Sequence, residues 1–266
     1  MYVSTPAIII KTQKYKEFDE IITAFTKKFG KVSMFAHSSK RIKSKLLSGT
    51  QVFSYVDMEL DLRQTSSRLF NSKSNDSFYN FSQNLHKYYL ASYLCEIIDK
   101  TQTENQTELR LFDVFLQTFR IMKDKEVDLR LLRLIFELHL IDALGIKPNL
   151  LSCSICRQTN PDLLHNIDMT TGTLVCDECL KLKTPNIFTL DKNLIRFIKY
   201  VYNKNIEVSV NAKISPILVE MLDEFNYNYI LSFYGDLKLH SIEILKQEEK
   251  YDKSRTSRPS NWKNRS

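Results

Sequence analysis

The spacing of apolar and polar residues changes once along the chain, near residue 78. Before that point, runs rich in β-branched or apolar residues are Tyr2–Ile10, Ile21–Phe25 and Val32–Ala36, with a turn at Phe29-Gly30-Lys31. Gln51–Leu60 alternates apolar and polar residues, as a half-buried strand does. Four or five short strands in this length predict a small antiparallel barrel. The polar residues 71–77 predict a linker after it.

From Phe78 onward, apolar residues recur every three or four positions, which is typical of amphipathic helices. The expected helices are Phe78–Asp99, Leu109–Met122, Leu129–Leu144, Leu190–Tyr202 and Pro216–Phe233. Gly145 ends the third helix, and Ser215 is a good N-cap before Pro216. A segment with four cysteines interrupts these helices.

These patterns predict an α+β multidomain protein. We expect a barrel domain at residues 1–77, a helical domain at 78–152 and 181–245, and a cysteine-bearing insertion at 153–180. Residues 246–266 form a basic tail without an apolar face, which predicts disorder.

The composition is that of a globular protein, with 43% hydrophobic and 26% charged residues among 266. The start, MYVSTPAIIIKTQK, lacks the basic region of a signal peptide, and no apolar run is long enough to span a membrane. We therefore expect a cytoplasmic protein with reduced cysteines and no membrane association.

The net charge of +7 is concentrated at the two ends of the chain. Residues 1–80 carry +6 and the tail carries +4, whereas 81–145 carry −2 and 146–245 carry −1. Seven cations and no acid lie between Ile21 and Val56, and four of them form one cluster: Lys40, Arg41, Lys43 and Lys45. Such segregation favours a nucleic-acid surface over an ordinary solvated turn. Stacking aromatics are available at Phe25, Phe29, Phe35 and Phe53, although alternating strand aromatics are more often core.

Cys153, Cys156, Cys176 and Cys179 form two Cys-x2-Cys pairs, the spacing of a structural zinc site. Two disulfides or an iron–sulfur cluster are the alternatives. A closed shell of four sulfurs leaves no coordination position for catalysis, so the zinc is expected to hold a short segment together. Cys95 stands alone on a predicted helix and is expected to be buried. Neither a phosphate-binding glycine loop nor a metal-spaced histidine pair occurs, so the sequence indicates a non-enzymatic protein.

Four stretches of the chain together match a known pattern: AIIIKTQKYKEFDEIITAFTKKFGKVSMFA, AHSSKRIKSK, YLASYLCEIIDK, and FELHLIDALGIKPNLLSCSIC followed by GTLVCDEC. In this order and spacing they resemble the RecO family of bacterial recombination mediators. The resemblance implies an N-terminal OB-fold, a helical domain and a zinc-binding insertion. It also implies binding of single- and double-stranded DNA, annealing of complementary strands, and loading of RecA with RecR on DNA coated by the single-stranded-DNA-binding protein SSB.

Several residues inherit roles through this resemblance. Lys40, Arg41, Lys43 and Lys45 match the family's basic loop, and Lys11 and Lys14 are weaker DNA-contact candidates. The four cysteines inherit the zinc. The acidic SSB tail docks on the helical domain, where Arg130 and Arg133 are candidate contacts. Ser38 stands where the family usually has glycine, so a different backbone path is possible there. The alternative is a protein–protein adaptor that docks acidic partner tails, with incidental DNA contact.

Overall fold

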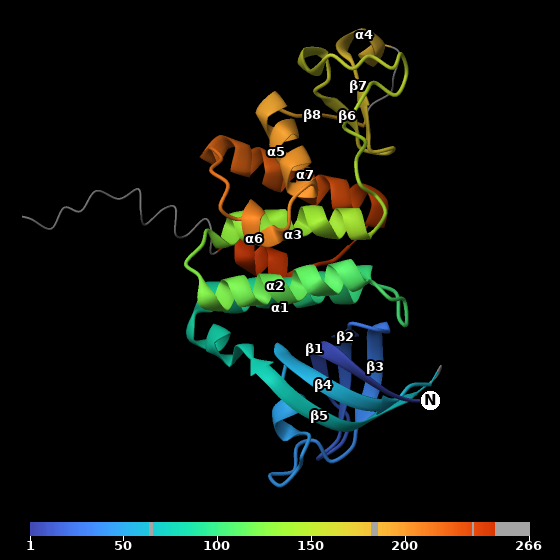
Figure 1. Cartoon of the computed structure of the whole chain (residues 1–266), viewed down its shortest axis with the longest axis vertical. Helices are drawn as coiled ribbons and strands as arrows, with labels where there is room; N and C mark the ends of the chain where they lie inside the picture. Colours follow the sequence, from blue (N-terminus) through green and yellow to red (C-terminus); the bar gives the residue numbers. More distant parts are fainter. Residues whose placement is uncertain (64–65, 182–185, 236, 248–266) are drawn as a thin grey trace, which may run out of the picture.

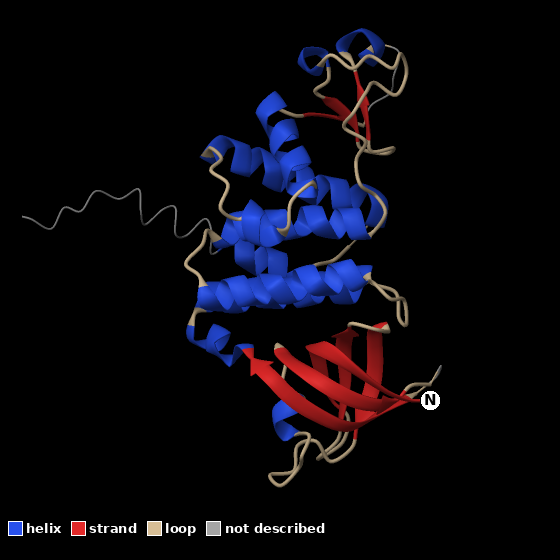
Figure 2. Cartoon of the chain, viewed as in Figure 1, coloured by secondary structure: helices blue, strands red, loops and turns tan. Residues whose placement is uncertain are grey.

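The computed structural model describes residues 1–63, 66–181, 186–235 and 237–247. A barrel, a layer of helices and a small sheet follow one another along the longest axis (Figure 1). Among the described residues, the strands lie at the two ends of the molecule, and the long helices lie between them (Figure 2). Within the described residues, no helix is long and apolar enough to cross a membrane. The predicted basic tail lies outside the described residues, except for its first two, which are helical.

Five strands close the barrel in the order β1-β2-β3-β5-β4. They are β1 (Tyr2–Lys14), β2 (Glu20–Thr26), β3 (Gly30–Ala36), β4 (Ser54–Asp61) and β5 (Ser67–Ser77). The β3–β5 pair is parallel and the other pairs are antiparallel. A short helix, η1 (Leu47–Gly49), lies in the connection from β3 to β4. This is the five-stranded OB-fold that the resemblance implied.

The linker predicted at residues 71–77 is wrong, because these residues are the second half of β5 and pair with β4. Most of them face solvent, and the buried Ser72 satisfies its hydroxyl by donating to the Gly49 carbonyl at 2.8 Å. A strand without inward apolar residues carries no period-two hydrophobic signal. The polar composition therefore concealed a strand.

The helical layer begins directly after β5. Its elements are η2 (Phe78–Gln83), α1 (Leu85–Thr101), α2 (Leu109–Asp124), α3 (Leu129–Ala143), α5 (Lys192–Tyr202), α6 (Ile206–Ser209) and α7 (Pro216–Tyr234), and residues 240–247 are also helical. The single helix predicted from Phe78 is divided at Asn84, whose side chain accepts from the Lys87 N–H and caps α1. Ser215 caps α7 as expected, by accepting from the Leu218 N–H.

The helices α1 and α2 cover one face of the barrel. Ile8, Ile10 and Phe25 point outward from β1 and β2 and join the hydrophobic core of the helices. Lys27 pairs with Asp113 of α2 at 2.9 Å at the rim of this contact. The Gly30 turn approaches the α1–α2 loop so closely that an added Cβ would lie 1.8 Å from the Gln106 carbonyl oxygen. The opposite end of the barrel, with the β1–β2 hairpin and the β3–β4 loop, faces away from the helices (Figure 1).

The cysteine-bearing insertion lies between α3 and α5. It contains η3 (Pro161–Leu163), β6 (Asn166–Asp168), β7 (Thr173–Val175), α4 (Asp177–Leu180) and β8 (Ile187–Thr189). These three-residue strands form an antiparallel sheet with β6 in the centre. Buried residues of the insertion, such as Ile167 and Leu174, belong to the same hydrophobic cluster as the helices.

Candidate nucleic-acid interface and metal centre

The basic cluster lies in the β3–β4 loop, residues 37–53, at the open end of the barrel (Figure 1). The side chains of this cluster are exposed: Lys40, Arg41, Lys43 and Lys45. Beneath them, Leu46 is buried in the core of the barrel and anchors the loop. The loop therefore presents four cations to solvent from a fixed base.

Ser38, near the start of this loop, has an unusual backbone torsion. Its φ of 53° is left-handed, the region that favours glycine. Glycine adopts such a torsion readily, and Ser38 adopts it here with a side chain. The Ser38 N–H donates to the Asp19 carboxylate at 2.8 Å. This hydrogen bond holds the pKa of Asp19 below its usual value, and the nearby His37 adds to the effect.

Glu20 joins the loop to the first strands. Its buried carboxylate accepts from the Ser39 hydroxyl at 2.7 Å and pairs with the Lys40 ammonium at 3.3 Å. Lys14 is the register partner of Glu20 at the end of β1, so it lies beside the loop. Lys11 does not, because its ammonium pairs with Asp99 of α1 at 3.2 Å. The structure thus brings Lys14, but not Lys11, to the basic cluster.

The sequence analysis did not identify the aromatic residues of the β1–β2 hairpin as part of this surface. The Lys40 N–H donates to the Phe18 carbonyl at 3.2 Å, and the Arg41 guanidinium lies 5.2 Å above the Phe18 ring. Tyr15, in the same hairpin, is 52% exposed. The signal was the alternation of aromatic and basic residues in the turn sequence KYKEF. Of the aromatics proposed earlier, Phe25 and Phe53 are buried against the helices and cannot stack bases, whereas Phe35 is half-buried.

The four cysteine sulfurs lie within 4.8 Å of one another. Cys153 and Cys156 lie at a turn after α3, Cys176 is the residue directly before α4, and Cys179 lies within α4. Four thiolates around one tetrahedral ion of zinc size are about 3.8 Å apart, given metal–sulfur bonds of about 2.3 Å. The arrangement therefore fits one metal ion.

The thiols of this cluster differ in acidity. Burial works to raise the pKa of Cys153, but the N–H groups of Cys156, Cys176 and Ile155 outweigh it and lower this pKa to about 6. Burial, reinforced by the neighbouring thiols, raises the pKa of Cys179 to about 12. Cys153 is thus ready as a thiolate at neutral pH, and a bound cation would be needed to ionise Cys179.

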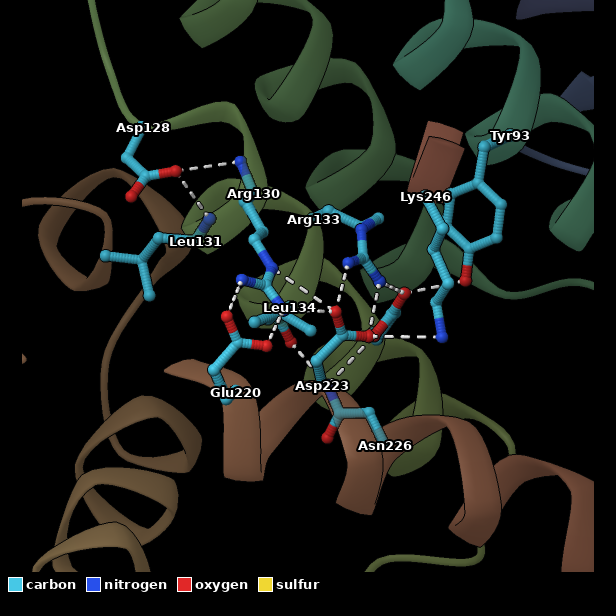
Figure 3. Close-up of polar contacts among 11 residues, drawn as sticks. Tyr93, Asp128, Arg130, Leu131, Arg133, Leu134, Glu220, Asp223, Asn226 and Lys246 are labelled. Atoms are coloured by element: carbon cyan, nitrogen blue, oxygen red, sulfur yellow. Dashed lines mark hydrogen bonds and ion pairs between the residues drawn. The ribbon is translucent and has the colours of Figure 1, made fainter. Parts of the chain in front are cut away.

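The two arginines of α3 are held by carboxylates of α7 and by Glu137 of α3 itself (Figure 3). Arg133 is 1% exposed and donates to Glu137 at 2.9 Å and to Asp223 at 3.0 Å. Arg130 is closer to the surface, with Glu220 at 2.7 Å and Asp223 at 2.8 Å. Burial would raise the pKa of Asp223, but its cationic neighbours, chiefly Arg133, lower it to about 2.

A cavity of about 480 Å³ opens beside Arg130, between the start of α1, the α2–α3 loop and the start of α7. Its apolar wall includes Leu90, Val219 and Leu245, and its cations include Lys87 and Lys125. This volume lies in the range of ligand pockets. Arg130 lines the cavity, whereas Arg133 does not.

An OB-fold barrel with an open basic end, a covering helical layer and a four-cysteine insertion form an architecture that suits nucleic-acid binding. Residues 1–78 match the family model described as "Recombination protein O N terminal", and residues 82–241 match "Recombination protein O C terminal". The chain belongs to the RecO family of DNA repair and recombination proteins.

Individual relatives agree along nearly the whole chain. The DNA repair protein RecO of Alkaliphilus metalliredigens is 30% identical over 249 residues, which is 93% of this chain and 100% of that protein. The RecO of Clostridium novyi is 31% identical over 83% of this chain and 86% of its own. The RecO of Listeria monocytogenes is 26% identical over 92% and 94%, respectively. The resemblance inferred from the sequence is confirmed.

Proposed function

We propose that this protein is a non-catalytic DNA-binding mediator that anneals complementary single strands. With RecR, it helps to load RecA on SSB-coated DNA in gap repair, in the cytoplasm at the nucleoid. The observation that carries the proposal is the exposed basic loop at the open end of an OB-fold barrel: Lys40, Arg41, Lys43 and Lys45, with Lys14 beside them.

The loop offers cations to phosphates and leaves the bases without specific partners. Each neutralised phosphate releases counterions, so binding weakens as salt rises and depends little on sequence. Annealing requires that property, because a strand held by its backbone keeps its Watson–Crick edges available to a complement. No step in this scheme consumes ATP.

The test is an annealing assay with complementary oligonucleotides, with and without SSB coating. Replacing the four loop cations by alanine should abolish annealing and weaken single-strand binding. It should also reduce the salt slope by up to about 3, since each phosphate contact contributes about 0.7 for single strands. The matched control removes four exposed lysines of the helical domain: Lys192, Lys204, Lys213 and Lys238. Unchanged affinity in the loop variant, or equal loss in the control, would contradict this site.

We also propose that the cavity beside Arg130 receives the acidic SSB tail. Its apolar wall suits the tail's apolar end, and Lys87, Lys125 and Arg130 suit its carboxylates. Arg133 lies behind Arg130 and would position Asp223 rather than touch the peptide. Arg130→Ala with Lys125→Ala should lower the affinity for a fluorescent tail peptide at least tenfold. Arg196→Ala with Lys199→Ala, a change of equal charge on α5, should leave peptide affinity unaltered.

This cavity also supports the alternative of a protein–protein adaptor. Under that reading, the protein binds the tail peptide with full affinity and bare oligonucleotides not at all. RecA loading separates the two: a gapped, SSB-coated substrate is supplied with RecR and RecA. The mediator requires both the basic loop and the cavity, whereas the adaptor requires the cavity alone.

We propose that the metal is a single structural Zn²⁺ held by the four cysteines of insertion 153–180. The donor set of four sulfurs within 4.8 Å supports it, since zinc imposes no geometry on a thiolate cage. Metal analysis should find one zinc per chain. Cys176→Ser should lower the zinc content and the melting temperature, while the folded fraction keeps its DNA affinity. A variant that folds normally yet loses DNA binding would show that the insertion itself contacts DNA.

A further inference from the structure

Two pairs of aromatic rings lie on the outer surface of the barrel. Tyr15 of the β1–β2 hairpin contacts Phe35 of β3, with ring centroids 5.1 Å apart. Tyr2 at the start of β1 contacts Phe70 of β5, with ring centroids 5.3 Å apart. We call these four residues the aromatic stripe.

Strand register connects the two halves of the stripe. Phe35 is the Cα partner of Arg68 in the parallel β3–β5 pair. The Arg68 guanidinium lies 5.5 Å from the centre of the Phe70 ring, two residues further along the same face of β5. Arg68 therefore follows Phe35 on the neighbouring strand and contacts Phe70, so it connects the two ring pairs.

The stripe is not part of a hydrophobic core. Tyr2 is 77% exposed, Tyr15 is 52% exposed and Phe70 is 44% exposed. The aromatics on the other side of the barrel, such as Phe25, are covered by α2. A contiguous set of exposed aromatic rings is uncommon on a soluble protein and marks an interaction surface.

Charge identifies the partner. Cations accompany the rings along the stripe: Lys16 lies 5.5 Å from the centre of the Tyr15 ring, and Arg68 lies beside Phe70. Arg41 of the basic loop covers Phe18 in the same hairpin as Tyr15, so the stripe continues into the cationic end of the barrel. Alternating rings and cations match a polyanion with exposed flat faces, which is single-stranded nucleic acid.

We propose that unpaired bases stack on the aromatic stripe while Arg68, Lys16 and Arg41 contact the flanking phosphates. This rests on the proposed function and gives it a strand preference. Bases inside a duplex have no free faces, so the stripe binds single strands and not duplexes. Annealing then removes the stacking contacts, and the product duplex leaves this surface while the basic loop still contacts its backbone.

The experiment compares a thymidine oligonucleotide with an abasic oligonucleotide of the same length, which has the phosphates but no bases. Phe70→Leu and Tyr2→Leu should each lower the affinity for the thymidine strand about tenfold. Affinity for the abasic strand and for duplex should not change, and Phe70→Tyr should restore binding. Tyr79→Leu is the matched control, since Tyr79 is a 63% exposed aromatic on η2, beside α1.

Thermal unfolding of each variant verifies that the barrel is intact, and Tyr2→Leu is the safeguard because its ring is the most exposed of the four. Equal affinity of wild type and both leucine variants for the thymidine strand would overturn the stripe. So would an equal loss on the abasic strand. Failure of the proposed function is distinct: the basic-loop variant would then bind all three nucleic acids as wild type does.

Discussion

The protein carries two groups of cations that look alike in sequence and differ in the structure. The cations of the β3–β4 loop, Lys40 to Lys45, extend from the open end of the barrel into solvent. Arg130 and Arg133 lie between α3 and α7, where Glu137, Glu220 and Asp223 hold them (Figure 3). Arg133 is almost completely buried.

The difference teaches that a charge is available to a partner only where the fold leaves it hydrated. A buried guanidinium has lost its hydrating water, and the neighbouring carboxylates take the place of that water. Removing one member of the group therefore leaves the remaining charges buried without a partner. An exposed lysine keeps its water and loses little when it is changed. Lys43 and Lys45 can therefore bind ligands without stabilising the fold, whereas Arg133 stabilises the fold without being free to bind.

The largest expected effect comes from Arg133→Ala. It leaves Glu137 and Asp223 buried without their main cation, which should cost about 3–5 kcal/mol in the free energy of unfolding. Urea denaturation measures this loss, and Arg196→Ala on the exposed side of α5 should cost no more than about 0.5 kcal/mol. A loss below 1 kcal/mol for Arg133→Ala would erase the contrast between the two groups.

The second-largest effect is expected from acid, which should weaken the ion pairs of Asp223 and so lower the free energy of unfolding. The pKa of Asp223 is lowered from 3.8 to about 2, so its ion pairs stabilise the fold above the unfolded-state value. This contribution, about 2 kcal/mol, is fully present at neutral pH and disappears as pH falls through 3.8 toward 2. Denaturation of wild type and Asp223→Asn between pH 7 and 2 measures it. The asparagine variant should be less stable at pH 7 and less sensitive to acid; parallel curves would refute the assignment.

A smaller effect tests whether the backbone torsion of Ser38 shapes the basic loop. Ser38 has a φ of 53°, and glycine relieves that strain at some cost in chain entropy. Ser38→Gly should therefore raise the free energy of unfolding by about 0.5–1 kcal/mol and leave DNA affinity unaltered. Ser44→Gly, at another position in the same loop, is the control and should not stabilise. A large change in DNA affinity would mean that glycine alters the loop path.

The smallest effect on stability belongs to the loop itself. Lys43→Ala with Lys45→Ala should change the free energy of unfolding by no more than about 0.5 kcal/mol per substitution, because both side chains are exposed. The same variant should reduce the salt slope of single-strand binding by about 1.4. Titrations at several salt concentrations measure the slope. Marked destabilisation would place these lysines with the buried group.

Prediction from sequence succeeded where the signal is local. The turn at Gly30, the caps at Ser215 and the two Cys-x2-Cys pairs depend on a few neighbouring residues, and the structure has them as expected. It failed at residues 71–77, where β5 is held by pairing with β4 and carries almost no apolar pattern. The exposed aromatic stripe escaped notice for a related reason, since Phe35 and Phe70 become neighbours only through the β3–β5 pairing.

By itself, the sequence determined the barrel strands with apolar faces, the helical layer, the clustered cysteines and the position of the basic loop. Those features follow from periodicity, caps and charge within short windows. Tertiary structure alone decided which aromatic rings are core and which face solvent, and whether an arginine meets water or a carboxylate. These outcomes depend on what another segment, distant in sequence, places over the side chain. Phe25 and Phe35 belong to neighbouring strands, yet only Phe25 has helices packed on it.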